Sequence, residues 1–289
     1  MLRRVSVPTC VALAALLAAS SSCSRKSDNE PPIATPSLTL SHDKVPIGSP
    51  VKVTYKFVVA PDAKFTTDYW VFVHVLDPTG ELLWTEDHLP SPPTSSWKPG
   101  QTVEYTRTVF VPNYPYIGEA HVRLGLYDPP TGKRLPLNAQ EKSRREYEVT
   151  KFQILASSEN IFLIDKEGWH LNEVDPQNPQ NEWKWTKKAA TLSFRNPKKD
   201  STIYFQYDAR VDLFSPPQQL SIKVNGQEIA AMPADAKFPT LKSVPVTAAQ
   251  LGTGDMVDLV FELDRTFQPG GPDPRELGIR IFHTYVEPK

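Results

Sequence analysis

The amino-acid sequence predicts an all-β chain with two β-sandwich domains in tandem. Apolar and polar residues alternate with a period of two, for example in residues 51–57, 202–211 and 255–263. This period is typical of strands that bury one face. The 29 prolines lie between such runs, where they end strands and favour turns. No long stretch has the 3.6-residue apolar period of a helix, and one helical turn is expected at residues 247–251, capped by Thr247.

The first 22 residues indicate an export signal that is cleaved. Two early arginines precede the apolar run VALAALLAA at residues 11–19, and three serines follow before Cys23, as in a signal peptide. The apolar run is shorter than the ~20 residues that span a bilayer. The junction resembles the lipobox of bacterial lipoproteins, with Ser20 where leucine is usual. The resemblance implies that Cys23 carries a lipid; ordinary secretion and a membrane span are the alternatives.

The lipoprotein resemblance also implies a location. It places the chain in the bacterial cell envelope, held to a membrane by its N-terminal lipid. Because Ser24 follows the cysteine instead of aspartate, similarity to enterobacterial sorting rules favours the outer over the inner membrane, and the periplasm is the expected compartment. Residues 23–36 are polar, contain prolines and lack periodicity. We expect this segment to be the lipidated cysteine and a flexible tether.

Charge and cysteine content exclude several classes of function. The net charge of −1 gives no basic excess, so nucleic-acid binding is disfavoured. Of the two cysteines, Cys10 leaves with the signal and Cys23 is lipidated, so the mature chain has no thiol for a disulfide, a metal site or a nucleophile. The sequence has no Gly-x-Ser-x-Gly, no His-Glu-x-x-His and no glycine-rich phosphate loop. We therefore expect neither an enzyme nor a cofactor.

The first domain is predicted at residues 37–156. Its expected strands and two proline-glycine turns (DPTG, DPPTG) favour a sandwich of about seven short strands. The strands are expected at residues 51–57, 69–76, 81–84, 103–111, 120–127 and 147–155. The segments WVFVHVLDPTGELLWTEDHLP and HVRLGLYDPPTGKRLPL resemble an immunoglobulin-like module of bacterial envelope proteins and of large membrane glycosyltransferases. This resemblance implies a fold and says little about function.

The second domain is predicted at residues 157–289. Asn225-Gly226 follows an alternating run and is a strong hairpin signal, because a type I′ turn needs positive φ at both positions. The last strand is expected at residues 277–282. The stretches RTFQP and RELGI resemble a galactose-binding-like, jelly-roll module similar to those that end bacterial sugar-related transferases. The resemblance implies a glycan context but carries over no sugar-binding residue.

Tryptophans are the main functional lead, since their rings stack on the apolar C–H faces of sugars. Trp183 and Trp185 are two residues apart and so share one face of a strand. The predicted ligand-binding residues are Trp169, Glu173, Trp183, Lys184 and Trp185. A secondary candidate is the outward-facing row Tyr204, Gln206, Asp208 and Arg210. The alternative is that the tryptophans belong to the sandwich cores.

We expect the histidines and one cluster of charged residues to have structural roles. His74, His121 and Arg123 share a face if their strands pair, but the arginine would repel a cation, so we expect ordinary hydrogen bonds and no metal site. A second group of charges is expected to form ion pairs that hold the loop at residues 268–274. That group consists of Asp264, Arg265, Asp273, Arg275 and Glu276.

Together these observations predict a non-catalytic, lipid-anchored cell-envelope protein. Its expected role is to bind or organise a surface glycan, or to assist glycan assembly. One alternative is a structural or protein-interaction lipoprotein that docks other envelope proteins through its sheet edges. Another is an enzyme of unfamiliar chemistry, which would need a deep pocket with histidines and carboxylates from both domains.

Overall fold

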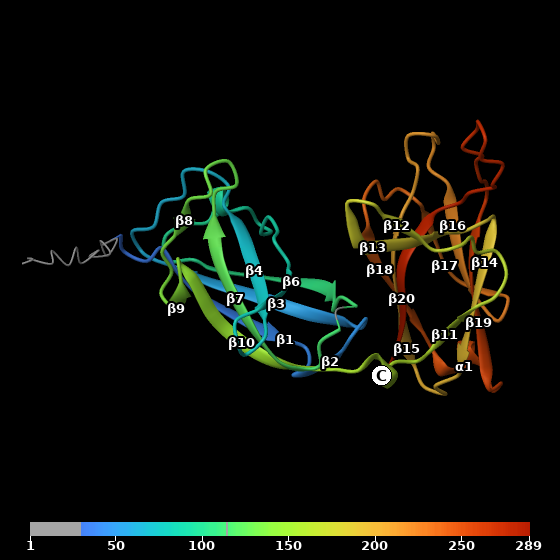
Figure 1. Ribbon diagram of the computed structural model, residues 1–289, viewed down its shortest axis with the longest axis horizontal. Coiled ribbons are helices and arrows are strands. Elements are labelled where there is room, and N and C mark those ends of the chain that lie inside the picture. The colour runs from blue at the N-terminus through green and yellow to red at the C-terminus, as the bar shows by residue number, and fades with distance from the viewer. Residues whose placement is uncertain (1–29, 114) are drawn as a thin grey trace, which may run out of the picture. The chain divides into compact units, whose positions relative to one another are not determined.

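The computed structural model describes residues 30–113 and 115–289, without the side chains of residues 178–180. These residues form four β-sheets, two from residues 34–155 and two from residues 163–288 (Figure 1). The all-β sandwich prediction is confirmed. The predicted signal peptide at residues 1–22 and the lipidation of Cys23 lie outside the described residues.

The first pair of sheets consists of a three-stranded sheet and a larger one. The small sheet has the order β1-β3-β6 and the larger has the order β2-β10-β7-β4-β5, to which β8 and β9 add short pairings. The strands are β1 (Ala34–Leu40), β2 (Lys44–Pro46), β3 (Pro50–Val59), β4 (Trp70–Leu76), β5 (Leu82–Thr85), β6 (Thr102–Phe110), β7 (Gly118–Tyr127), β8 (Arg134–Leu135), β9 (Gln140–Ser143) and β10 (Glu146–Leu155). Two 3₁₀ turns, η1 (Thr94–Ser96) and η2 (Ser157–Glu159), complete the described secondary structure of this part.

Strand β1 corrects the predicted tether at residues 23–36. One compact unit spans Pro32–Lys289, and Ala34 already pairs with Val59 of β3. The physical reason is that Ala34, Pro36 and Leu38 are buried in alternation along β1. Pro36 is compatible with this strand because β1 lies at the edge of its sheet and needs no donor on its outer side.

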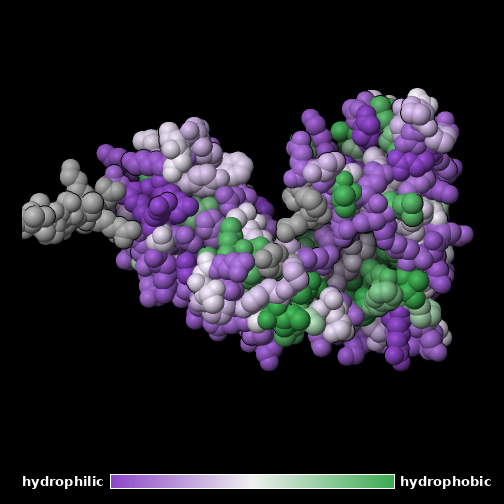
Figure 2. All heavy atoms as spheres, viewed as in Figure 1, coloured by the Kyte–Doolittle hydropathy of each residue, from purple (hydrophilic) through white to green (hydrophobic). Residues whose placement is uncertain are grey.

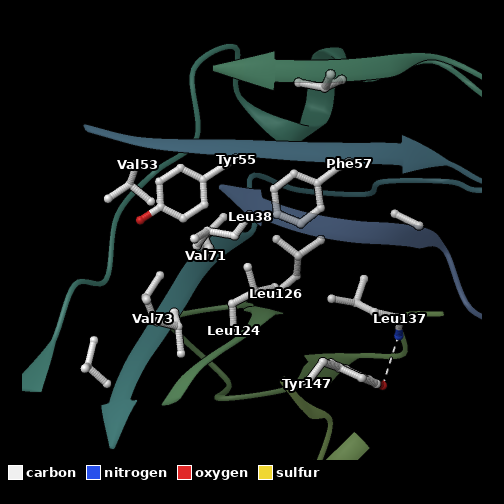
Figure 3. Packing of buried hydrophobic residues seen from close by; sticks show 14 of the residues in the cluster. Leu38, Val53, Tyr55, Phe57, Val71, Val73, Leu124, Leu126, Leu137 and Tyr147 are labelled. Carbon is white, nitrogen blue, oxygen red and sulfur yellow. Dashed lines mark hydrogen bonds between the residues drawn. The ribbon is translucent and has the colours of Figure 1, made fainter. Parts of the chain in front are cut away.

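One apolar cluster lies between these two sheets. Tyr55 and Phe57 of β3 are 1% and 0% exposed, and they face Val71, Leu124 and other inward residues of the larger sheet (Figure 3). Outside the strands, the backbone N–H of Leu137 donates to the hydroxyl of Tyr147 at 2.9 Å, which satisfies a buried donor inside the cluster. The strands therefore have their own hydrophobic core.

The second pair of sheets has five strands each. One sheet has the order β11-β14-β19-β16-β17 and the other β12-β13-β20-β15-β18 (Figure 1). The strands are β11 (Leu163–Asp165), β12 (Glu173–Asp175), β13 (Asn178–Trp185), β14 (Ala189–Arg195), β15 (Ser201–Asp208), β16 (Gln219–Val224), β17 (Gln227–Pro233), β18 (Thr240–Val246), β19 (Met256–Leu263) and β20 (Arg280–Pro288). A second apolar cluster, with Phe194, Phe205 and Phe261 among its fully buried members, fills the space between them.

Two local predictions in this region are confirmed. Asn225 and Gly226 have φ of 49° and 81° and join β16 to β17. Thr247 caps helix α1 (Ala248–Leu251), where it forms a reciprocal capping box with Gln250. Both signals depend on neighbouring residues alone, which is why sequence reasoning finds them.

Two strand boundaries differ from the prediction. The last strand is β20 at Arg280–Pro288, instead of residues 277–282, because pairing with β13 and β15 begins at Arg280, whereas Leu277 forms an isolated bridge with Phe267. The strand expected over residues 202–211 ends at Asp208. Arg210 therefore lies in the turn that follows β15.

Each of the four sheets has one edge strand that contains a proline. These prolines are Pro36 in β1, Pro46 in β2, Pro233 in β17 and Pro245 in β18. Because proline has no backbone N–H, it fits edge strands far better than central ones. The high proline content thus has a structural role within the strands as well as between them.

The surface is mainly hydrophilic in the view of Figure 2, with hydrophobic residues in patches. No strand in the described residues pairs across residues 156 and 157, although the division into domains at that point stays a prediction. None of the helices in the described part of the chain is long and apolar enough to cross a membrane.

Candidate functional site: an arginine between two tryptophans

Strand β13 places Trp183 and Trp185 on the same face of its sheet. Both side chains are half-buried, and Lys184 between them points to the opposite side, where its backbone partner is the buried Ile281. The face with the two tryptophans is turned away from the core. The spacing of the two rings along the strand is the one predicted from alternation.

Arg280 of β20 lies between these two tryptophans. In register it faces Trp185 on one side and Asp208 of β15 on the other. Its guanidinium carbon is 4.7 Å from the ring centre of Trp183 and 5.8 Å from that of Trp185. Phe282, two residues further along β20, contributes a third ring at 5.3 Å. These distances are within the range of cation–π contacts.

Asp208 fixes the orientation of this arginine. Nε of Arg280 donates to Oδ1 of Asp208 at 2.7 Å, and Nη2 donates to Oδ2, so the pair is bidentate. The Asp208 side chain is 4% exposed, whereas that of Arg280 is 30% exposed. The structure gives Nη1 no hydrogen bond to the described residues. The arginine therefore presents one edge to solvent from a fixed position.

We call this surface the Arg280 face, defined by Trp183, Trp185, Asp208, Arg280 and Phe282. It joins two of the primary candidate residues to one residue of the secondary row. The register of β13, β20 and β15 aligns them, since Trp185, Arg280 and Asp208 lie side by side on adjacent strands.

The remaining residues of the secondary row differ in accessibility. Tyr204 is 6% exposed and donates its hydroxyl to Oε2 of Glu287 at 3.0 Å, and burial raises its pKa to about 12. Gln206 is half-buried on the same strand. Arg210 pairs with Asp212 beyond the end of β15, and its guanidinium is 5.6 Å from the ring of Phe267. Arg210 therefore reaches the margin of the face, because Phe267 packs against Trp185.

Glu173 is opposite Trp183 on β12 and is engaged by another arginine. Arg275 donates from Nη1 to Oε1 of Glu173 at 2.6 Å and makes further bonds to Asp273. Hydrogen bonds to Asp273 and then to Glu173 raise the pKa of Arg275 above its usual value. This triad holds the segment before β20 against β12, so Glu173 has a positioning role beside the Arg280 face.

Trp169 and Lys184 lie on the other side of the sheet. The indole N–H of Trp169 donates to the carbonyl of Thr191 at 2.7 Å, and its ring packs against the buried Phe261. Lys184 forms an ion pair with Asp165 of β11. The five predicted residues therefore divide between two faces of β13 instead of forming one site.

Arg280 and Phe282 are the residues that sequence reasoning missed. Residues 280–282 read Arg-Ile-Phe, with two apolar residues in succession, so no alternation there marks Arg280 and Phe282 as members of one face. The prediction placed the start of this strand at Leu277, three residues before Arg280. The pairing of Arg280 with Asp208 spans 72 residues, and no local pattern predicts that pairing.

The expected charge cluster also divides into separate groups. Arg275 bonds to Asp273, while Arg265 lies 3.5 Å from Asp264 and donates to backbone carbonyls at residues 216 and 217. Glu276 accepts from the Thr266 hydroxyl at 2.8 Å. Two ion pairs, Arg275–Asp273 and Arg265–Asp264, thus lie in separate places instead of forming one network, and Glu276 makes a hydrogen bond instead.

The histidines of the first pair of sheets make the hydrogen bonds that were expected. His74 is opposite Arg123 in register. Oε1 of Glu146 is 3.1 Å from Nδ1 of His74 and 3.8 Å from Nη1 of Arg123. His121 bonds to Glu148 at 3.1 Å and to Glu119 at 2.9 Å. Among the described residues, no group of three histidine, cysteine, aspartate or glutamate side chains has a metal-binding arrangement.

Comparison with known proteins gives distant structural similarities. No protein-family model matches the chain, and no curated protein matches its sequence. The solved structures to which it is similar include a xylan-binding module, CBM15 (9% identity, 44% of this chain, 97% of that chain, TM-score 0.25). They also include the CBM51-2 and INT domains of ZmpB from Clostridium perfringens (10% identity, 60% and 38% covered, TM-score 0.26).

A third similar structure is a β-glucuronidase of Bacteroides uniformis (11% identity, 86% of this chain, 30% of that chain, TM-score 0.27). This chain thus spans well under half of the Clostridium and Bacteroides structures. The neighbours include carbohydrate-binding modules, but at these TM-scores the likeness carries no argument about the ligand or activity of this chain.

Proposed function

We propose that this chain is a non-catalytic glycan-binding protein of the bacterial cell envelope, and that the Arg280 face is its binding surface. The observation that carries this proposal is Arg280, held by Asp208 between two tryptophan rings with one edge open to solvent. The immunoglobulin-like and galactose-binding-like assignments of the two domains belong to the same proposal.

The chemistry of the face suits a sugar. Aromatic rings offer an apolar surface to the C–H groups of a pyranose, while an arginine donates to its hydroxyl oxygens. Asp208 accepts from Nε–H and from one N–H of Nη2 of Arg280 and balances the charge of the guanidinium, so the pair has no net charge that would attract an anion. The N–H groups on the Nη1 side remain to donate to hydroxyl oxygens of a sugar.

The test is binding of the full chain to envelope polysaccharides and to a glycan array. The double variant Trp183→Ala/Trp185→Ala should bind at least tenfold more weakly, since truncation of buried anchoring aromatics commonly costs more than about 1 kcal/mol each. Trp70→Ala is the matched control, because Trp70 is 38% exposed on the first pair of sheets and lies outside the face. Binding by the wild type that survives the double variant would contradict the assigned surface. Absence of binding to every glycan would contradict the function.

The anchoring part of the proposal concerns Cys23. We propose that it is lipidated and holds the chain to the membrane, with the outer membrane favoured over the inner and with the folded part in the periplasm or beyond. Cys23→Ser should move the protein from the membrane fraction to the soluble fraction after cell breakage. An unchanged membrane fraction in that variant would contradict lipid anchoring at this residue.

A further inference from the structure

A cavity of about 410 Å³ lies on the opposite side of β13 from the Arg280 face. It opens between β11 of one sheet and β13 of the other, at an edge of the second sandwich where the two sheets are not bridged by a strand pair. The residues that line it and bear on its chemistry are Asp165, Trp169, Asn172, Glu182, Lys184 and Thr284. Its volume lies within the range of about 300–1,000 Å³ that is usual for small-molecule pockets.

Alternation along β13 explains why polar groups enter this space. Because Trp183 and Trp185 point outward, Glu182 and Lys184 point toward the other sheet. There Lys184 meets Asp165 of β11, so an ion pair crosses between the sheets at the mouth of the cavity. Their side chains are 35% and 40% exposed. Charged groups at this edge replace the apolar contacts that close the rest of the core.

The lining of the cavity combines apolar side chains with one unsatisfied polar group. Leu163, Leu192 and Ile281 line it, and Trp169 is held in place by its hydrogen bond to the Thr191 carbonyl. The hydroxyl of Thr284 is buried and has no hydrogen-bond partner among the described residues. A buried polar group without a partner is unusual in a folded protein and calls for an explanation.

We propose that this cavity binds a single neutral sugar residue. The bound sugar would place its apolar face against Trp169 and the aliphatic wall, would bond to Thr284 at the inner end, and would meet Asn172, Glu182 and Lys184 at the mouth. This site is additional to the Arg280 face. Phe282 borders both, whereas Trp183, Trp185, Asp208 and Arg280 do not line the cavity.

The charge of the lining selects a neutral ligand. Asp165 and Glu182 carry two negative charges against the single positive charge of Lys184, and Lys184 is already paired. The amide of Asn172 donates to Oε2 of Glu182 at 2.7 Å, so this donor is also engaged. The carboxylate of a uronic acid would therefore enter a cavity whose lining has a net negative charge and whose lysine is already paired. The hydroxyl groups of a neutral sugar can both donate and accept hydrogen bonds there.

The experiment measures binding of methyl glycosides of glucose, galactose, mannose and N-acetylglucosamine to the full chain. Saturation-transfer NMR identifies the binding sugar, and calorimetry gives its affinity. Thr284→Val removes only a hydroxyl that has no protein partner, so the variant should fold. It should bind about 3- to 10-fold more weakly, the usual worth of one hydrogen bond. Lys184→Met keeps the aliphatic stem and should weaken binding at least as much.

Two controls separate this site from the proposed glycan face. Lys188→Met alters an exposed lysine of the neighbouring turn and should leave binding unchanged. Trp183→Ala/Trp185→Ala should weaken polysaccharide binding at least tenfold while monosaccharide binding persists. Loss of monosaccharide binding in that double variant would assign the sugar to the Arg280 face and overturn the cavity proposal.

Three further results would overturn the cavity proposal. The first is that the wild type binds none of the glycosides. The second is that Thr284→Val and Lys184→Met leave the affinity for the glycosides unchanged. The third is glucuronic acid binding as tightly as glucose, which would contradict the assignment of a neutral ligand. None of these results bears on polysaccharide binding by the Arg280 face, so the two proposals can fail separately.

Discussion

The two pairs of sheets each carry an arginine beside a carboxylate on a face turned away from the core, and the two arginines are held differently. Arg123 shares Glu146 with His74, and Nη1 of Arg123 is 3.8 Å from Oε1 of Glu146. Arg280 has Asp208 to itself, in a bidentate pair. Arg280 also lies against tryptophan rings that are half-buried. The comparison teaches that an ion pair marks a candidate binding surface only when it fixes one edge of the arginine beside open aromatic surface.

Asp208→Asn should give the largest change in stability. It removes the charge from a side chain that is 4% exposed and leaves Arg280 without its counter-charge. Breaking a buried pair usually costs about 3–5 kcal/mol, and the partial exposure of Arg280 should reduce this to about 2–3 kcal/mol. Urea unfolding measures the change. Asp212→Asn, at an exposed pair with Arg210, is the control and should stay within about 0.5 kcal/mol. Equal effects of the two variants would refute the assigned role of Asp208.

The next largest effect should be a pH dependence that arises in the first pair of sheets. His88 is 4% exposed, its Nδ1 bonds to the Glu86 carbonyl, and its Nε2 bonds to the Tyr105 hydroxyl. Burial lowers the pKa of His88 from 6.5 to about 4. The folded state therefore binds this proton less readily than the unfolded state. Its contribution to stability is complete above pH 6.5 and is lost as the pH falls toward 4.

The measurement is the free energy of unfolding at several pH values for the wild type and for His88→Gln. The wild type should lose about 2 kcal/mol more than the variant between pH 6.5 and 4. Comparing the two proteins removes the contribution of carboxylates that titrate in the same range. Parallel pH profiles would show that His88 is not the group responsible.

Glu146→Gln sharpens the comparison of the two arginines directly. The amide keeps an acceptor for His74, and Arg123 has only a distant contact to lose. We expect a loss of about 1 kcal/mol, smaller than that of Asp208→Asn, since the partners keep about a fifth of their exposure. Unfolding in urea under the same conditions provides the comparison. A larger loss at Glu146 would reverse the ranking of the two pairs.

The smallest effect should come from Glu173→Gln. Arg275 keeps its bonds to Asp273 in this variant, and both partners of the lost pair are about one third exposed. We expect a change below about 0.5 kcal/mol in the free energy of unfolding. Glycan affinity, measured beside it, should fall by less than in the double tryptophan variant. A larger fall would mean that Glu173 touches the ligand.

Sequence reasoning predicted the parts of the fold that depend on local chemistry. The period of two, the Asn225-Gly226 turn and the Thr247 cap each follow from neighbouring residues, and the structure contains them. The start of β1 was also within reach, because alternation begins at Ala34, but the polar residues before it suggested a tether. A short alternating run is therefore easily missed when the residues before it are polar.

The candidate site was predictable only in part. Alternation correctly placed Trp183 and Trp185 together, but proximity in sequence wrongly grouped them with Trp169 and Lys184 on one surface. The contact of Asp208 with Arg280 depends on how β15 and β20 pair. The start of β20 depends on where its pairing with β13 and β15 begins, at Arg280. Pairing and packing between distant segments have no signature in a single sequence, so the central arginine was missed.

The prolines at the sheet edges have a consequence for how other molecules can recognise this protein. A strand from a second chain extends a sheet by matching a continuous ladder of N–H and C=O groups. Pro36, Pro46, Pro233 and Pro245 each break that ladder on one edge strand of a sheet. At those edges a partner must recognise side chains instead of a continuous backbone ladder.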